Sequence, residues 1–156
     1  MPKQQPIELF MPPNMLKAKV GGSAVGLDSA AIKRAEQAME SLKTEFTDWI
    51  NADVRKLGEC RDGFAKEPNA DSQGDLYRAA HDLKGQALTF GHPMAARVAS
   101  SLCKLLDGNT NAPLALIDAH VDAIRVIVKQ NVKDSAIANM LATELEGRVA
   151  EALAAG

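Results

Sequence analysis

Apolar residues recur every three or four positions along most of this 156-residue chain. This spacing places them on one side of an α-helix, and no stretch shows the strict alternation of a half-buried strand. Short breaks rich in Pro, Gly, Asn and Asp interrupt the pattern, and short connections make consecutive helices antiparallel neighbours. The sequence therefore predicts an all-α fold, an antiparallel up-and-down four-helix bundle with an irregular N-terminal arm and an extra C-terminal helix.

The first two helices have recognisable ends. Asp28 or Ser29 is predicted to cap a helix that runs to about residue 64. The second is predicted to begin at Ser72, which forms a weak capping box with Asp75, and to end at Gly91. The apolar stripe predicted for the first helix comprises Ile32, Ala35, Met39, Leu42, Phe46, Ile50, Leu57 and Phe64.

The remaining helices follow short turns. Pro93 suits the first turn of a third helix that ends at Gly108, and a fourth starts near Pro113. A last helix is expected over roughly 135–153, capped by Asp134 or Ser135, either separate or continuing the fourth through a bend. Its predicted stripe comprises Ile137, Leu141, Leu145, Val149 and Leu153.

Three segments are predicted. Residues 1–27 contain four of the seven prolines, so they are expected to form an irregular arm, and their apolar residues indicate that it partly packs on the domain. Residues 28–133 are predicted to form the four-helix bundle. Residues 134–156 are predicted to form the C-terminal helix, appended to the last bundle helix or continuing it.

Composition excludes several classes of protein. The net charge of −2 argues against a general nucleic-acid binder. No stretch approaches the roughly 18 apolar residues of a membrane span, and no secretory signal is visible, so a cytoplasmic protein is expected. Cys60 and Cys103 form no CxxC motif and are expected to be buried, reduced thiols.

The stretch AAHDLKGQALTFG, residues 79–91, places a histidine, a lysine and a glycine inside the second predicted helix. On a wheel of about 100° per residue, the apolar residues of this helix fall within roughly 60° of one direction. His81, Lys84 and Gly85 lie together on another face, three and four residues apart, where Tyr77 and Leu88 join them. The predicted core stripe comprises Leu76, Ala79, Ala80, Leu83, Ala87 and Phe90.

Gly85 is the unusual member of this face. A glycine in the middle of a helix costs roughly 0.5–1 kcal/mol relative to alanine, and nothing on a solvent-exposed face offsets that cost. Glycine does leave a surface without a side chain, on which a partner can approach His81, and Leu88 adds an apolar patch. A neutral imidazole can attack a phosphoryl group, and Lys84 is placed to neutralise the phosphoryl oxygens.

The stretch HDLKGQALTFG resembles the motif of histidine phosphotransfer (Hpt) domains of multistep phosphorelays. That motif is a histidine, a hydrophobic residue two positions later, then Lys-Gly, and a second glycine after a short mixed stretch. The resemblance covers residues 75–107 tightly and extends loosely over about 30–132 through the four-helix periodicity. The matching residues are His81, Leu83, Lys84, Gly85 and Gly91.

The resemblance implies that His81 accepts a phosphoryl group from the aspartyl phosphate of a response-regulator receiver domain and passes it to another receiver. Lys84 would assist electrostatically. No cofactor is expected on this chain, since Mg²⁺ would belong to the receiver, and a hybrid histidine kinase is one candidate partner. The residues expected to dock the receiver are Gly85, Leu88, Tyr77 and Arg78.

One part of the resemblance departs from the family pattern. Family members often place a polar side chain, commonly glutamine, on the next helix opposite the histidine. Counting about the turn at residue 92 puts Cys103 opposite His81, with Lys104 beside it. Gln86 lies on the other flank of its helix and is given a supporting role. Whether Cys103 or Lys104 completes the site is left open.

Two other functions compete with the phosphocarrier. A metal or cofactor bundle would need inward-facing Glu and His residues, whereas Asp118 and Asp122 beside His120 do not face it on a helix, and no metal site is expected. A non-catalytic helical adaptor could use the same docking face without a nucleophile. Since no glycine-rich phosphate loop or ATP-lid signature is present, no autonomous kinase activity is expected, and a monomer suits a shuttling carrier.

Overall fold

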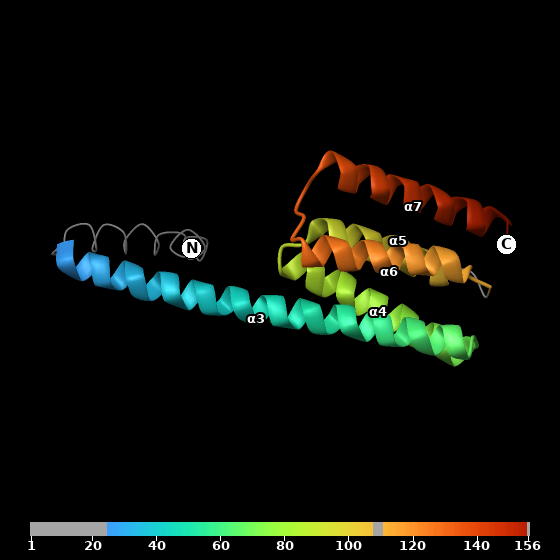
Figure 1. Ribbon diagram of the computed structural model, residues 1–156, viewed down its shortest axis with the longest axis horizontal. Coiled ribbons are helices and arrows are strands. Elements are labelled where there is room, and N and C mark those ends of the chain that lie inside the picture. The colour runs from blue at the N-terminus through green and yellow to red at the C-terminus, as the bar shows by residue number, and fades with distance from the viewer. Residues whose placement is uncertain (1–24, 108–110, 156) are drawn as a thin grey trace, which may run out of the picture. The chain divides into compact units, whose positions relative to one another are not determined.

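The computed structural model describes residues 25–107 and 111–155. These residues contain helices and no strand, so the all-α prediction is confirmed (Figure 1). Among them, no helix combines the length and the hydropathy needed to cross a membrane. The helices are α3 (Val25–Lys66), α4 (Ala70–Thr89), α5 (Pro93–Asp107), α6 (Leu114–Lys129) and α7 (Ala136–Ala155).

The chain divides into two units, residues 1–45 and 46–156. The described part of the first unit is the beginning of α3, which starts at Val25, before the predicted caps Asp28 and Ser29. The predicted arm over residues 1–27 lies outside the described residues apart from this helix start. The predicted boundaries at 28 and 133 stay predictions.

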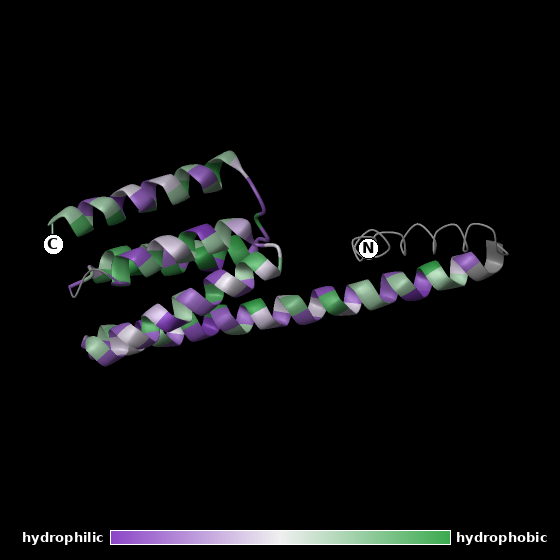
Figure 2. Cartoon of the chain, turned by 180° about the vertical axis from the view of Figure 1, so that it is seen from behind, coloured by the Kyte–Doolittle hydropathy of each residue, from purple (hydrophilic) through white to green (hydrophobic). Residues whose placement is uncertain are grey.

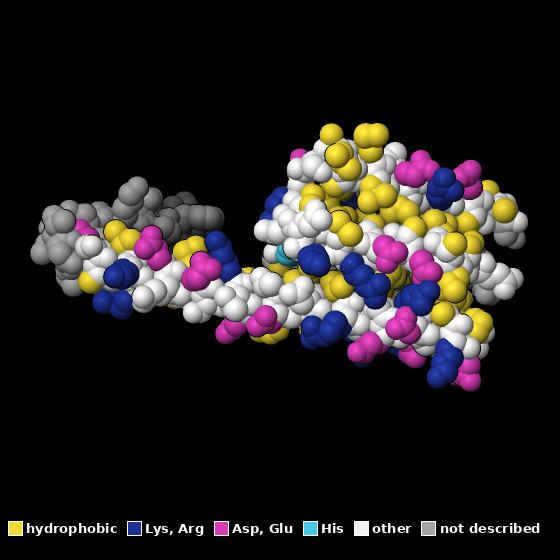
Figure 3. Space-filling view, in the orientation of Figure 1, with side chains coloured by type: hydrophobic (Ala, Val, Ile, Leu, Met, Phe, Trp, Pro, Cys, Tyr) yellow, Lys and Arg dark blue, Asp and Glu magenta, His cyan; other side chains and the backbone are white. Residues whose placement is uncertain are grey.

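The stripe predicted for this part of α3 is not a buried core. Ile32 is 55% exposed, and Met39 and Leu42 are exposed to a similar degree. Helical periodicity shows which residues share a face, but burial requires another element against that face. Figure 3 shows hydrophobic atoms on the surface of this helix in the first unit.

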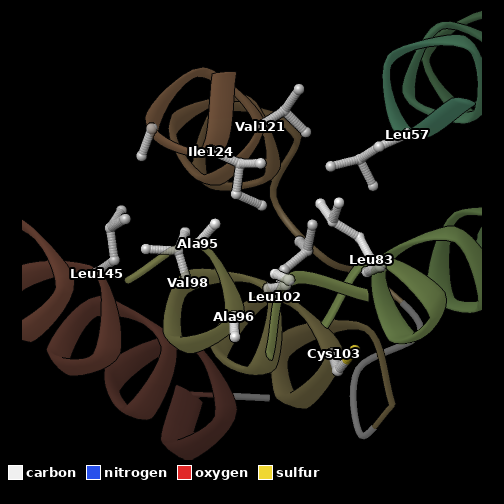
Figure 4. Close-up of a cluster of buried hydrophobic side chains, with 14 of the residues drawn as sticks. Leu57, Leu83, Ala95, Ala96, Val98, Leu102, Cys103, Val121, Ile124 and Leu145 are labelled. Atoms are coloured by element: carbon white, nitrogen blue, oxygen red, sulfur yellow. The ribbon is translucent and has the colours of Figure 1, made fainter. Parts of the chain in front are cut away.

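The second unit is a bundle in which the rest of α3 packs with α4, α5 and α6. Leu57 of α3, Leu83 of α4, Leu102 of α5 and Ile124 of α6 converge in one core (Figure 4). Hydrophobic and hydrophilic residues recur in turn-length groups along the helices, as expected for amphipathic helices (Figure 2). Of the stripe predicted for α4, Leu76, Ala79, Ala80, Leu83 and Ala87 are buried, whereas Phe90 is only half-buried, because it follows the last helical residue and stacks on Phe46 of α3 with ring centroids 4.6 Å apart. The apolar residues at helical spacing in α5 and α6 are buried too: Ala95, Val98, Ala99, Leu102, Leu105, Leu106, Ile117, Val121, Ile124 and Val128.

Helix α7 packs on α5 and α6 with a face different from the predicted one. Ile137 is 79% exposed, Leu141 and Leu153 are exposed too, and only Leu145 and Val149 of the predicted stripe are buried. The helix is alanine-rich, and its small side chains allow α7 to lie close to α5. The prediction was wrong because the sequence of a helix that is apolar on several sides does not show which of those sides is buried. The buried residues are Ala138, Ala142, Leu145 and Val149.

Helix α4 has a different start from the predicted one but the predicted end. Asn69 is its N-cap and exchanges hydrogen bonds with Ser72, so Ser72 is the third helical residue and not the cap. At the other end, Gly91 has a φ of 83°, and the His92 N–H donates to the Ala87 carbonyl at 2.7 Å. This six-residue closure needs a left-handed residue, which glycine adopts without strain.

Two polar links join helices across the bundle. Arg61 of α3 donates to both carboxylate oxygens of Asp118 on α6, one of them at 2.8 Å, and this lowers the pKa of Asp118. His120 of α6 is fully buried. Its Nδ1 donates to the Leu116 carbonyl at 2.7 Å, so its Nε2 is left to accept from the Ser101 hydroxyl of α5 at 2.9 Å.

We expect stability to fall as the pH drops below about 6.5, because burial lowers the pKa of His120 from its ordinary value of 6.5. In that range the unfolded chain binds a proton that the folded chain does not. The free energy of unfolding then falls by up to about 1.4 kcal/mol per pH unit for this residue. Urea denaturation between pH 5 and 8 measures the effect. His120→Asn should give a shallower dependence, and an identical slope in both proteins would contradict the explanation.

Candidate functional site

The outward face of α4 carries the candidate nucleophile. His81 is exposed, while Ala80 and Leu83 on either side of it are fully buried. Lys84 is half-buried and Gly85 is exposed, one turn beyond the histidine. The helical wheel therefore predicted correctly which residues of this motif face away from the core.

Tyr77 borders His81 on one side. Their rings are stacked, with centroids 6.1 Å apart and an interplanar angle of 27°. Tyr77 is half-buried and packs against the hydrophobic core. The tyrosine ring is consequently a supported surface that limits the positions of the imidazole, whose remaining surface is open to a partner.

The two glycines of the motif have different roles. A Cβ added at Gly85 would meet nothing within 4 Å, so the packing of this chain does not require a glycine there. The Gly85 carbonyl accepts its expected helical bonds and a further one from the Thr89 hydroxyl at 3.0 Å. Gly91, by contrast, is required by its backbone conformation. Gly85 is thus a helix surface left clear beside His81.

Lys84 lies next to the residues that the next helix contributes. Cys103 of α5 is buried, and burial raises the pKa of its thiol, while the nearby Lys84 ammonium acts in the opposite direction. Lys104 is exposed and lines a groove together with Lys84 and Leu88. The structure therefore brings both Cys103 and Lys104 to the side of Lys84, with the thiol beneath the surface and the second ammonium on it.

The other predicted supporting residues lie toward α3 or along the helix. Arg78 is exposed and forms an ion pair with Asp75 on its own helix. It lines a groove between α3 and α4 together with Asp53 and Asp82. Gln86 is half-buried, and its main-chain carbonyl accepts from the Phe90 N–H at 2.9 Å. Their predicted roles in docking and support stay predictions.

The two flanks of the His81 face differ in charge. Toward α3 lie the carboxylates of Asp53, Asp75 and Asp82 together with the cationic groups of Lys56 and Arg78, which offset most of their charge, and the pKa of Asp53 is raised by burial and by the charge of Asp82. Toward α5 lie the ammonium groups of Lys84 and Lys104. An anionic group that reaches His81 is therefore favoured on the α5 side.

The other two histidines have surroundings unlike those of His81. His120 is held in the core by Ser101 and Leu116. His92 is buried in the turn between α4 and α5, where burial and the charge of Lys133 lower its pKa. In the part of the chain that the structure describes, no three His, Cys, Asp or Glu side chains gather as metal ligands would.

The sequence model of one protein family, described as the Hpt domain, matches residues 31–147. The chain belongs to the Hpt domain family. Hpt domains serve histidine phosphotransfer in phosphorelays and interact with receiver domains of response regulators or hybrid kinases. No curated protein and no solved structure matches the chain.

Some residues near the Hpt motif could not be found by sequence reasoning. Arg97 and Ser100 of α5 and Glu146 of α7 line the same groove as Lys84 and Leu88. Glu146 is 62 positions from Lys84 in the sequence, and only the packing of α7 onto α5 brings it there. No local motif signals this placement.

Replacing the two motif glycines by alanine should have opposite effects on stability. Gly85→Ala should raise the free energy of unfolding by about 0.5–1 kcal/mol, because the site is helical and the added methyl group meets no atom. Gly91→Ala should lower it by roughly 1–2 kcal/mol, because alanine is strained at positive φ. Urea denaturation with an unchanged slope measures both. Destabilisation by Gly85→Ala would mean that this glycine has a structural role.

Proposed function

We propose that His81 is the phosphorylated residue of this Hpt domain protein. It accepts a phosphoryl group from the aspartyl phosphate of one receiver domain and transfers it to an aspartate of another. The observation that carries the proposal is an exposed imidazole on the outer face of α4, with Lys84 and the cleared surface of Gly85 one turn away. The proposed setting is the cytoplasm, and a monomer suits a carrier that exchanges partners.

The transfer needs a neutral imidazole, whose free nitrogen lone pair attacks the phosphorus atom. A nitrogen–phosphorus bond forms while the bond from phosphorus to the aspartate oxygen breaks, and the aspartate carboxylate leaves. The second ring nitrogen keeps its proton or releases it to water. The reverse sequence returns the phosphoryl group to a second aspartate, so no further reactant is consumed.

Lys84 supplies a positive charge close to the phosphoryl oxygens, which stabilises the negative charge that they share during transfer. Lys84 is half-buried near Cys103, and burial limits the motion of its aliphatic stem, whereas Lys104 is exposed. We therefore assign the main electrostatic role to Lys84. Mg²⁺ would be held by carboxylates of the receiver.

His81→Gln should abolish phosphorylation of the chain, because glutamine has a similar size but no nucleophilic nitrogen. The assay mixes the protein with a radiolabelled, aspartyl-phosphorylated receiver and follows an acid-labile, alkali-stable phosphate on this chain. His92→Gln is the matched control and should retain labelling if it folds. A receiver that binds His81→Gln normally and signals normally with it would favour the non-catalytic adaptor, and persistent labelling of the variant would contradict the assignment.

Gly85→Glu should weaken receiver binding at least tenfold while leaving the melting temperature unchanged or slightly raised. The added side chain projects into open space on the docking face, and its charge repels an acidic partner. Titration calorimetry and thermal denaturation separate the two effects. Gly63→Glu on the exposed side of α3, where an added Cβ also meets nothing within 4 Å, is the matched control. If the unchanged chain and both variants bind the receiver equally well, Gly85 is not in the interface.

A further inference from the structure

We propose that α7 forms one wall of the receiver-docking surface, so that the groove between α4, α5 and α7 receives the acidic rim of a receiver's phosphorylation site. The inference rests on the function proposed above and adds a surface that the motif helix alone does not contain. The volume of the groove is about 280 Å³. Its lining includes Lys84 and Leu88 of α4, Ser100 and Lys104 of α5, and Glu146 of α7.

The groove is continuous with the face that carries His81. Leu88 follows His81 by seven positions, two helical turns along the same side of α4, and Lys84 lies between them. Leu88 is a large apolar side chain that is 61% exposed and is not part of the hydrophobic core. A partner large enough to cover His81 and Leu88 together therefore reaches the opening of the groove.

One arginine adds polar links between α5 and α7 at this position, beside the buried contacts of α7. The Arg97 guanidinium donates to both carboxylate oxygens of Glu146 at 2.8 Å, and also to Asn139 Oδ1 and Thr143 Oγ1 at 3.1 Å each. These acceptors span two turns of α7. The ion pair lowers the pKa of Glu146. The guanidinium binds Glu146 in a bidentate geometry and contacts two further side chains of α7 with single hydrogen bonds, so the wall is preorganised before a partner arrives.

The charge of the groove fits a receiver. Arg97 neutralises Glu146, which leaves the two ammonium groups of Lys84 and Lys104 as the net charge of the lining. An aspartyl phosphate is anionic, and carboxylates are the protein ligands that bind its Mg²⁺. A receiver thus presents an acidic surface around the atom that reacts, and the groove presents its cationic counterpart on the α5 flank of His81.

Filling the groove separates docking from chemistry. Ser100→Trp places an indole in the groove without touching His81, and Ala119→Trp, on the exposed face of α6, is the control. Two phosphoryl donors are compared for each protein: a phosphorylated receiver and phosphoramidate, a small molecule that needs no docking surface. We expect Ser100→Trp to lower the rate of transfer from the receiver at least tenfold, with phosphoramidate labelling within twofold of the unchanged chain. Ala119→Trp should match the unchanged chain with both donors.

A second pair of variants tests α7 itself and does not depend on tolerance of a tryptophan. Glu146→Gln removes the carboxylate that offsets the cationic lining, so receiver association should become two- to fivefold faster and more sensitive to salt. Glu151→Gln, on another part of the exposed surface of α7, should leave association unchanged.

The outcomes distinguish the two proposals. Labelling of the unchanged chain together with receiver transfer that is the same in Ser100→Trp and Ala119→Trp would overturn the groove and leave His81 as the phosphorylated residue. Identical association of Glu146→Gln and Glu151→Gln would likewise remove α7 from the interface. If neither donor labels the unchanged chain, the proposed function fails and the docking surface fails with it.

Discussion

The burial of α5 is the constraint on which the rest of the structure depends. Ten of its fifteen residues are buried, because α4, α6 and α7 pack around it. Side chains such as Val98, Leu102 and Leu105 are fully removed from water, each contributing roughly 1.5–3 kcal/mol to the folded state. With its inner side held against α5, α4 retains one outward face, and that face carries His81.

The surroundings of His81 come from two sources, the neighbouring residues of its own helix and the side chains of the helices packed beside it. Within α4, helical spacing alone places Tyr77, Lys84 and Gly85 around the imidazole. Between helices, packing adds a flank of mixed charge toward α3 and a flank with the ammonium groups of Lys84 and Lys104 toward α5. The short-range arrangement provides the exposed imidazole of His81 and a neighbouring cation. The long-range arrangement makes the two flanks unequal, because an anionic group is attracted more strongly to the α5 side of His81 than to the α3 side, where positive and negative side chains are mixed.

Sequence patterns predicted the fold well where one face of a helix is clearly apolar, as in α4, α5 and α6. They failed where that condition was not met. Helix α7 is apolar around most of its circumference, so the predicted stripe contained Ile137 and Leu141, which are exposed, and omitted Ala138 and Ala142, which are buried. The start of α4 was missed because Asn69 and Ser72 are both good caps, and the hydrogen bonds of the folded loop decide between them.

By itself the sequence determined the all-α fold and the outward face of the His81 motif. Both follow from periodicity, which depends only on the geometry of a single helix. The tertiary structure alone decided that the buried Cys103 lies near Lys84, that Arg97 pairs with Glu146, and that α7 borders the groove lined by Lys84 and Leu88. Those relations join side chains of different helices, and they exist only because the packing of the helices around a shared core fixes which outer faces lie next to one another.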